Sequence, residues 1–309
     1  ISLCLCLSPV TIRAASIVHD TTSEFATGTL ERIVDSGSGS SPSIDLSYHE
    51  LPSDINTVGL WHMNEASGNV LDSSGNSNTG TATGTTVVAG KLGNGRNFNG
   101  AIPDDITVTG NAGLKPKSVT VEAWVKFTTA DTSGGEVVSM GDSYSLRVYT
   151  TGQSRFSIYN GTNWNEIVTS DVASLADGNW HHIAGIKDAN TNTVWVYVDG
   201  VGKSATSTGT ISYNLGANLL IGKHGNGGTV FDYTGTIDEV RISNTARTPE
   251  DIKADAQRRP YGNYISPTLD LGADISSIDS LVWTESGVQM GNGETPYSST
   301  NLVAAWNFN

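Results

Sequence analysis

The loop that follows the apolar run Leu60–Met63 carries residues that could bind a metal ion. Carboxylate and amide oxygens are the hard ligands that Ca²⁺ prefers. In this loop they belong to Asp72, Asn76 and Asn78. The loop is not an EF-hand, because Thr83 occupies the twelfth position counted from Asp72, where that motif has a glutamate. The same side chains also form Asx turns by binding their own backbone, so the loop predicts either a calcium site or a set of turns.

Two further residues are candidates for ligand binding. Trp164 lies in the polar stretch 160–165, where an indole is placed to stack on the face of a sugar. His224 lies in a glycine-rich loop between Gly222 and Gly228. No helix is expected after these glycines, so they do not predict a phosphate-binding loop.

A catalytic site is not expected within this sequence. Glu122 is on a predicted strand, and no second acid shares its face of that strand, whereas glycoside hydrolysis needs two carboxyl groups about 5–9 Å apart. The nucleophile-elbow and zinc-protease motifs are also absent. His181 and His182 are adjacent in a predicted strand, so they point to opposite faces and cannot chelate one ion together.

Composition narrows the possible partners. The 309 residues include 31 acids against 17 Lys and Arg, for a net charge of −14. Such a chain should be repelled by phosphate backbones, so nucleic acid is not expected as a partner. No segment is long and apolar enough to predict insertion into a membrane.

The first residues resemble the end of a secretory signal peptide. Residues 1–16 combine an apolar run with small residues around Arg13–Ser16, where a signal peptidase could cut. The alternative is an apolar strand. Both cysteines, Cys4 and Cys6, lie in this segment, so the mature protein would have no disulfide. We therefore expect an extracellular protein, secreted or on the cell surface.

The elements that must position these residues are strands. Apolar and polar residues alternate through Ser118–Phe127, which predicts a half-buried strand. Asn160-Gly161 and Asp199-Gly200 are typical hairpin turns. The one predicted helix is Thr248–Ala256, with a threonine cap followed by proline. Many strands with close turns predict an all-β fold, a jelly-roll β-sandwich of two antiparallel sheets.

Polar segments flank this β-rich region, and each is predicted to be a linker or a small β segment. They are residues 17–56 and 258–300. Ser266–Leu271 repeats the pattern of Ser41–Leu46, and Trp306 repeats the context of Trp61. Two echoes in the same order indicate a tandem repeat. Residues 301–309 are then predicted to start a second, truncated module.

Six motifs in order identify a family resemblance. They are Trp61–Glu65 with Ser67-Gly68, Asp72–Asn76, Val119–Val125, Asp177–Ala184, Val196–Gly200 and Gly235–Ile242. Together they cover about residues 57–257 and resemble the laminin G-like modules of the concanavalin A-like lectin and glucanase superfamily. One departure is Asn64, where the family usually has aspartate. The resemblance implies two packed antiparallel sheets, and it implies that Asp238 helps to hold a structural calcium ion together with the loop at Asp72.

These observations predict a non-catalytic recognition or adhesion module, stabilised by calcium, in an extracellular protein with repeated domains. Its partner would be a glycan or a surface protein. Two alternatives stay open, because fold alone does not choose among them. The region could be an accessory domain of a glycoside hydrolase or peptidase whose catalytic domain lies elsewhere, or a structural spacer in a surface stalk.

Overall fold

The computed structural model describes residues 2–4, 29–31, 33–35, 44–100, 104–129, 134–168, 174–207, 209–225, 231–257 and 263–265. The chain divides into two compact units. One unit is Glu50–Gln257, and the other combines Ile1–His49 with Arg258–Asn309. The first unit therefore includes residues 50–56, which the sequence analysis assigned to the preceding polar segment.

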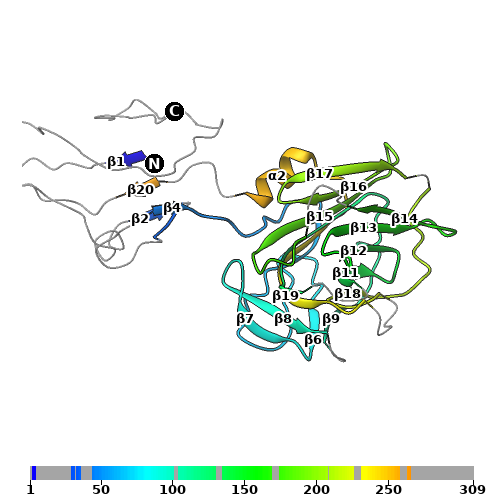
Figure 1. Ribbon diagram of the computed structural model, residues 1–309, viewed down its shortest axis with the longest axis horizontal. Coiled ribbons are helices and arrows are strands. Elements are labelled where there is room, and N and C mark those ends of the chain that lie inside the picture. The colour runs from blue at the N-terminus through cyan, green and yellow to red at the C-terminus, as the bar shows by residue number, and fades with distance from the viewer. Residues whose placement is uncertain are drawn as a thin grey trace, which may run out of the picture. The chain divides into compact units, whose positions relative to one another are not determined.

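The larger unit is a sandwich of two antiparallel sheets, as predicted (Figure 1). The eight-stranded sheet is formed by β5 (Thr57–Trp61), β7 (Thr86–Ala89), β8 (Asn94–Asn99), β10 (Val119–Lys126), β15 (His181–Asp188), β16 (Thr193–Val198), β17 (Val201–Thr206) and β19 (Thr234–Ser243). Its strand order is β17-β16-β15-β10-β19-β8-β7, and β5 pairs with β19 beside β8.

The seven-stranded sheet is formed by β6 (Gly80–Thr83), β9 (Asp105–Val108), β11 (Gly135–Met140), β12 (Tyr144–Val148), β13 (Ser154–Tyr159), β14 (Trp164–Val168) and β18 (Leu219–Ile221). Its order is β14-β13-β12-β11-β18-β9-β6. Because side chains alternate along a strand, each sheet turns one apolar face inward. The inward faces share one continuous core that includes Trp61, Val121, Leu146, Phe156 and Ile242.

Helix α2 (Pro249–Ala256) covers part of the outer face of the eight-stranded sheet (Figure 1). Its Ile252 packs against Ala184, Ile186 and Tyr197, away from the main core. The predicted start of this helix is confirmed: Thr248 caps it, and Asp251 completes a capping box.

Strand β10 is buried on both faces, so the prediction of a half-buried strand was wrong in this respect. Val119, Val121 and Val125 face the core as expected. On the opposite face, Glu122 and Trp124 are equally buried, because charged and aromatic groups from other segments cover them. Alternation predicts two faces of different polarity, but it does not reveal what lies over the polar face.

A buried arginine joins the segments that cover this outer face. Arg241 of β19 donates through Nη2 to Glu122 Oε1 at 2.6 Å and to Asp255 of α2. Its Nη1 donates to the carbonyl of Pro52 at 3.0 Å, so the leading segment is held as well. Burial alone would raise the pKa of Glu122, but Arg241 and His182 together outweigh it and hold that pKa at about 2.

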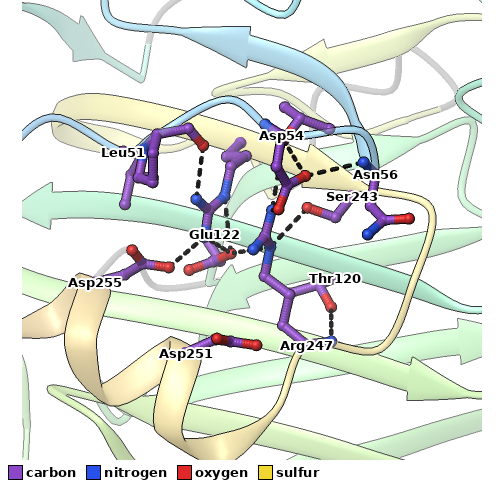
Figure 2. Close-up of polar contacts among 12 residues, drawn as sticks. Leu51, Asp54, Asn56, Thr120, Glu122, Ser243, Arg247, Asp251 and Asp255 are labelled. Atoms are coloured by element: carbon purple, nitrogen blue, oxygen red, sulfur yellow. Dashed lines mark hydrogen bonds and ion pairs between the residues drawn. The ribbon is translucent and has the colours of Figure 1, made fainter.

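Arg247 extends this network toward the surface. Figure 2 shows its guanidinium directed at Asp54 and Ser243. Nη2 donates to Asp54 Oδ2 and Nε to Ser243 Oγ, both at 2.9 Å, and the backbone N–H donates to Thr120. The two arginines together connect the leading segment, β10, β19 and α2.

The second unit contains four short described strands and β20 (Asn263–Ile265). The four are β1 (Ser2–Cys4), β2 (Thr29–Glu31), β3 (Ile33–Asp35) and β4 (Ile44–Leu46). Strand β20 pairs with β1 and β2, and β3 pairs with β4. Except for β1 and β20, the predicted signal peptide remnant, the polar segment 258–300 and the second module at 301–309 lie outside the described residues.

The Arg241 network generates a stability prediction. Arg241→Met should lower the free energy of unfolding by about 3–5 kcal/mol, because it removes the cation closest to the buried Glu122 and leaves only Arg247, whose Nε is 3.6 Å from Oε1. Chemical denaturation measures the loss. Adding Glu122→Gln should recover part of it, since the double variant no longer buries that carboxylate charge. A double variant less stable than Arg241→Met would contradict the role assigned to the ion pair.

Candidate functional site

The loop singled out from the sequence completes the open edge of strand β5. This strand pairs with β19 on one side. On the other side, Asp72 Oδ1 accepts from the Leu60 N–H at 3.0 Å, and the Leu60 carbonyl accepts from Ser73 N–H at 2.7 Å. The side-chain amides of Asn76 and Asn78 donate to the carbonyls of Thr57 and Val58. The loop thus supplies hydrogen bonds that a neighbouring strand would otherwise make.

The carboxylate of Asp72 also organises the loop itself. Its oxygens accept from Ser74 N–H at 2.9 Å, Ser74 Oγ at 2.8 Å and Asn78 N–H at 2.8 Å. The carbonyl of Asn78 accepts from Trp61 Nε1 at 2.8 Å, which anchors the loop to the core. These contacts describe the Asx-turn arrangement that the sequence left as an alternative.

Asp238 lies in a different environment. Its Oδ2 accepts from the N–H groups of Lys91 and Leu92, at 2.8 and 3.0 Å. Burial raises its pKa to about 7, against the opposing effect of these N–H groups. A β-bulge follows, where Glu239 adopts φ 52° and turns its carboxylate to His62 and to the Leu51 N–H.

The structure therefore brings Asp72, Asn76 and Asn78 together, but Asp238 shares no hydrogen-bond partner with them among the described residues. Both Asp72 oxygens are already occupied by N–H and O–H donors. A calcium ion needs six to eight oxygen ligands, so these donors would have to be replaced. Calcium at these four residues stays a prediction.

Trp164 begins the edge strand β14 and is 43% exposed, which makes it the one exposed aromatic side chain in the described part of the chain. It lies directly across from Tyr159, with ring centroids 5.4 Å apart. The four-residue turn between them is held by Asn160, whose Oδ1 accepts from Thr162 and Asn163. The two rings form an aromatic surface at the edge of the seven-stranded sheet.

A cationic and aromatic row lies on the outer face of the same sheet. Arg147 and Arg155 are cross-strand partners. Arg155 stacks on the ring of Tyr149 at 3.6 Å, and Arg147 lies between Tyr149 and Phe231, at 5.4 and 4.7 Å. Like charges placed opposite each other in a sheet are unfavourable, and the stacking on aromatic rings offsets this cost. Sequence reasoning missed this row, because it depends on the register of two strands.

His224 is held between two buried acids rather than in an open loop. Its Nδ1 is 3.3 Å from Glu136 Oε2 and 3.2 Å from Asp142 Oδ1, and its ring packs edge-on against Phe231. Although burial lowers the pKa of His224, Glu136 and Asp142 raise it above its usual value overall. No pattern in the sequence singled out these two acids, which come from β11 and its following turn.

The adjacent histidines point to opposite faces, as predicted. His182 is buried against Trp124, with centroids 5.4 Å apart. His181 bridges two acids near the surface, with Nδ1 2.8 Å from Asp199 and Nε2 3.2 Å from Asp177. The two rings share no common ligand position.

A second acid does approach Glu122, but it comes from outside strand β10. Asp255 of α2 binds the same guanidinium, so the two carboxylates converge on Arg241. The sequence could not indicate this, because the second acid comes from a helix packed on the sheet. Both side chains are buried, whereas a catalytic pair must reach its substrate.

The two packed sheets and their shared core define an all-β sandwich. A comparison with known families assigns this sandwich to a superfamily. A family model described as the concanavalin A-like lectin/glucanases superfamily, of laminin G type, matches residues 99–253. The chain belongs to this superfamily, which confirms the resemblance seen in the sequence.

Solved structures share the fold at low sequence identity. Domain 4 of AbnA, an extracellular arabinanase from Geobacillus stearothermophilus, matches with a TM-score of 0.53 and 23% identity over 65% of this chain and 98% of that one. The binding domain of Paraclostridial Mosquitocidal Protein 1 matches with a TM-score of 0.53 and 15% identity over 64% of this chain.

The receptor binding domain of botulinum neurotoxin mosaic serotype C/D gives a TM-score of 0.50 and 14% identity over 65% of this chain. The chain covers about half of each toxin domain, 51% and 50%. Among curated protein sequences, no match was found. In the described residues, no helix has both the length and the apolar character needed to cross a membrane.

The turn network predicts that Asp72→Ala destabilises the protein by about 2–3 kcal/mol, because several N–H groups lose a charged acceptor. Thermal and urea unfolding measure the loss. Stabilisation by these hydrogen bonds alone predicts the same loss in EDTA and in millimolar calcium. A loss that appears only with calcium would contradict this expectation and support the calcium site.

The ion pairs of His181 with Asp177 and Asp199 predict that the stability of the protein depends on pH. The hydrogen bond with Asp199 raises the pKa of His181, although burial opposes it. Hydrogen bonds from Asn179 lower the pKa of Asp177 to about 2. The stabilisation is therefore complete from about pH 4 to about pH 6.5, where unfolded His is still protonated. It is lost as the pH rises through the raised pKa of His181.

His181→Gln should accordingly melt about 2–4 °C below the wild type at pH 5, and the difference should shrink as the pH rises through the raised pKa of His181. Thermal melts across this pH range test it. A difference that stays constant, or grows toward pH 8, would show that His181 does not act through its charge.

Proposed function

We propose that the Glu50–Gln257 unit is a non-catalytic extracellular recognition module whose ligand is a glycan. The observation that carries the proposal is the aromatic pair of Trp164 and Tyr159. Trp164 is exposed, and the two rings lie 5.4 Å apart at the edge of the seven-stranded sheet. An exposed aromatic surface next to polar groups suits the apolar face and the hydroxyl groups of a sugar.

The polar groups beside this pair are compatible with a sugar ligand. Asn160 and Asn163 form the turn between the two strands, and Arg155 lies on β13 with Tyr159. The other partner expected from the sequence is a surface protein, which the module would bind in an adhesion role. A glycan is favoured because the exposed aromatic surface is small and flanked by amides, whereas protein interfaces need a larger buried patch.

The fold comparison supports a second candidate, an accessory domain of a glycoside hydrolase. The AbnA domain belongs to an arabinanase, was solved in complex with arabinotriose, and is covered over 98% of its length. The adjacent coding sequence would distinguish the candidates, because an accessory domain requires a catalytic domain in the same protein. A row of further modules without one would instead favour adhesion or a stalk spacer.

Binding to a glycan array tests the proposal. Trp164→Ala should weaken the strongest interaction about tenfold, because it removes a stacking contact of about 1–1.5 kcal/mol. Ile55→Ala is the matched control, since Ile55 is also an exposed apolar side chain and should leave binding unchanged. Equal effects of the two variants, or no glycan bound by the wild type, would count against a sugar site at Trp164.

A further inference from the structure

The cluster of Glu136, Asp142 and His224 serves no role in the proposed glycan site. Glu136 and Asp142 lie three positions before and after Ser139, on β11 and the turn that follows it. The segment after β18 brings in His224. One ligand atom from each of the three residues lies within 4.8 Å of the others. Glu136 and Asp142 are buried, and His224 is partly exposed.

The two distances from His224 Nδ1 to the carboxylate oxygens fit a tetrahedral ion. Nδ1 of His224 is 3.3 Å from the Glu136 oxygen and 3.2 Å from the Asp142 oxygen. Ligands at about 2.0–2.1 Å from a tetrahedral Zn²⁺ are about 3.3 Å from one another. Within the described residues, Nδ1 of His224 is buried and has no partner in hydrogen-bond geometry. The imidazole nitrogen thus lies at ion-pair distance from two carboxylates but has hydrogen-bond geometry with neither.

A second observation points to the same position. Oγ of Ser139 is fully buried and has no hydrogen-bond partner among the described residues. A side chain on Gly225 would collide with that oxygen and with Asp142, so the glycine lets the His224 segment approach β11 closely. The N–H of Gly225 donates to Glu136 Oε2 at 3.3 Å, which orients the carboxylate.

The other cluster of this kind in the described residues differs in one respect. Glu50, His62 and Glu239 also place ligand atoms within 4.8 Å. There, however, Nδ1 of His62 makes hydrogen bonds of 2.8 and 3.0 Å to Glu239, whose Oε2 also accepts from the Leu51 N–H. These groups satisfy one another. The cluster is therefore an internal control with similar residue types.

We propose that Glu136, Asp142 and His224 bind a divalent transition-metal ion of the zinc class, with the Ser139 hydroxyl beside the remaining coordination position. The imidazole nitrogen favours zinc over calcium, which takes oxygen ligands only. Two buried carboxylates repel each other, and a doubly charged cation neutralises both. This site is separate from the aromatic pair at Trp164, so it stands whether or not that pair binds a sugar.

Calorimetric titration of the full chain with zinc chloride, after treatment with EDTA, tests the proposal. We expect one zinc ion per chain with micromolar affinity or better, and a higher melting temperature in zinc. Cobalt chloride serves as a spectroscopic probe, because four-coordinate Co²⁺ absorbs visible light strongly. His224→Gln and Asp142→Asn should each weaken binding at least about tenfold.

Asp142→Asn is the sharper variant. Asp142 adopts φ 58°, a conformation that asparagine tolerates well, so this change should fold normally. A melting temperature in EDTA close to that of the wild type verifies this. His62→Gln, in the other cluster, should leave zinc binding unchanged.

Three results would overturn the proposal. They are the absence of stoichiometric zinc binding, binding that survives both Asp142→Asn and His224→Gln, and loss of binding in His62→Gln alone. Calcium that displaces zinc at similar concentration would overturn the assignment of the ion class. The glycan array repeated with Asp142→Asn separates the two proposals, because binding of sugar should persist when zinc binding is lost.

Discussion

The boundaries of the Glu50–Gln257 unit depend on the ion pairs and hydrogen bonds of the Arg241 guanidinium. Its donors reach Glu122 on β10, Asp255 on α2 and the Pro52 carbonyl. A buried charge is tolerated only when it is paired and fully hydrogen-bonded. The strand, the helix and the leading segment are therefore linked through one side chain. The compact unit accordingly extends from Glu50 to Gln257, beyond its first and last strands.

The two outer faces of the sandwich differ in the side chains that they carry. The outer face of the eight-stranded sheet is covered by charged groups and by α2, and Glu122, Asp238 and Arg241 are buried there. The outer face and edge of the seven-stranded sheet instead carry Trp164 and the cationic row of Arg147 and Arg155. The proposed sugar site at Trp164 and the Arg241 network therefore lie on different sheets.

Local patterns in the sequence predicted local structure well. The Asp199-Gly200 turn adopts positive φ at both positions, as a two-residue hairpin requires, and the helix begins at its predicted cap. Periodicity also placed Glu122 and Trp124 on the face opposite to the core. It did not reveal that this face is covered, because the covering groups come from other segments of the chain, such as Lys91 over Trp124 and Arg241 beside Glu122.

The chemistry of the clusters was harder to predict for the same reason. Asp72, Asn76 and Asn78 were found because they are close in sequence, yet their spacing fits turns and metal ligation equally well. Glu136 and Asp142 meet His224 only through the path of one loop over β11. No spacing rule marks such a cluster. Of its three residues, only the histidine stood out in the sequence.

The loop beside β5 has a consequence for how this protein behaves at high concentration. Strand β5 is short and wholly buried, and its free edge would be a template for pairing with a strand of another molecule. Asp72, Asn76 and Asn78 occupy that edge with their own side chains. Because side chains and not a strand complete the ladder, no new edge is created beyond them. The loop thus protects the sandwich against edge-to-edge aggregation and the exchange of strands between copies.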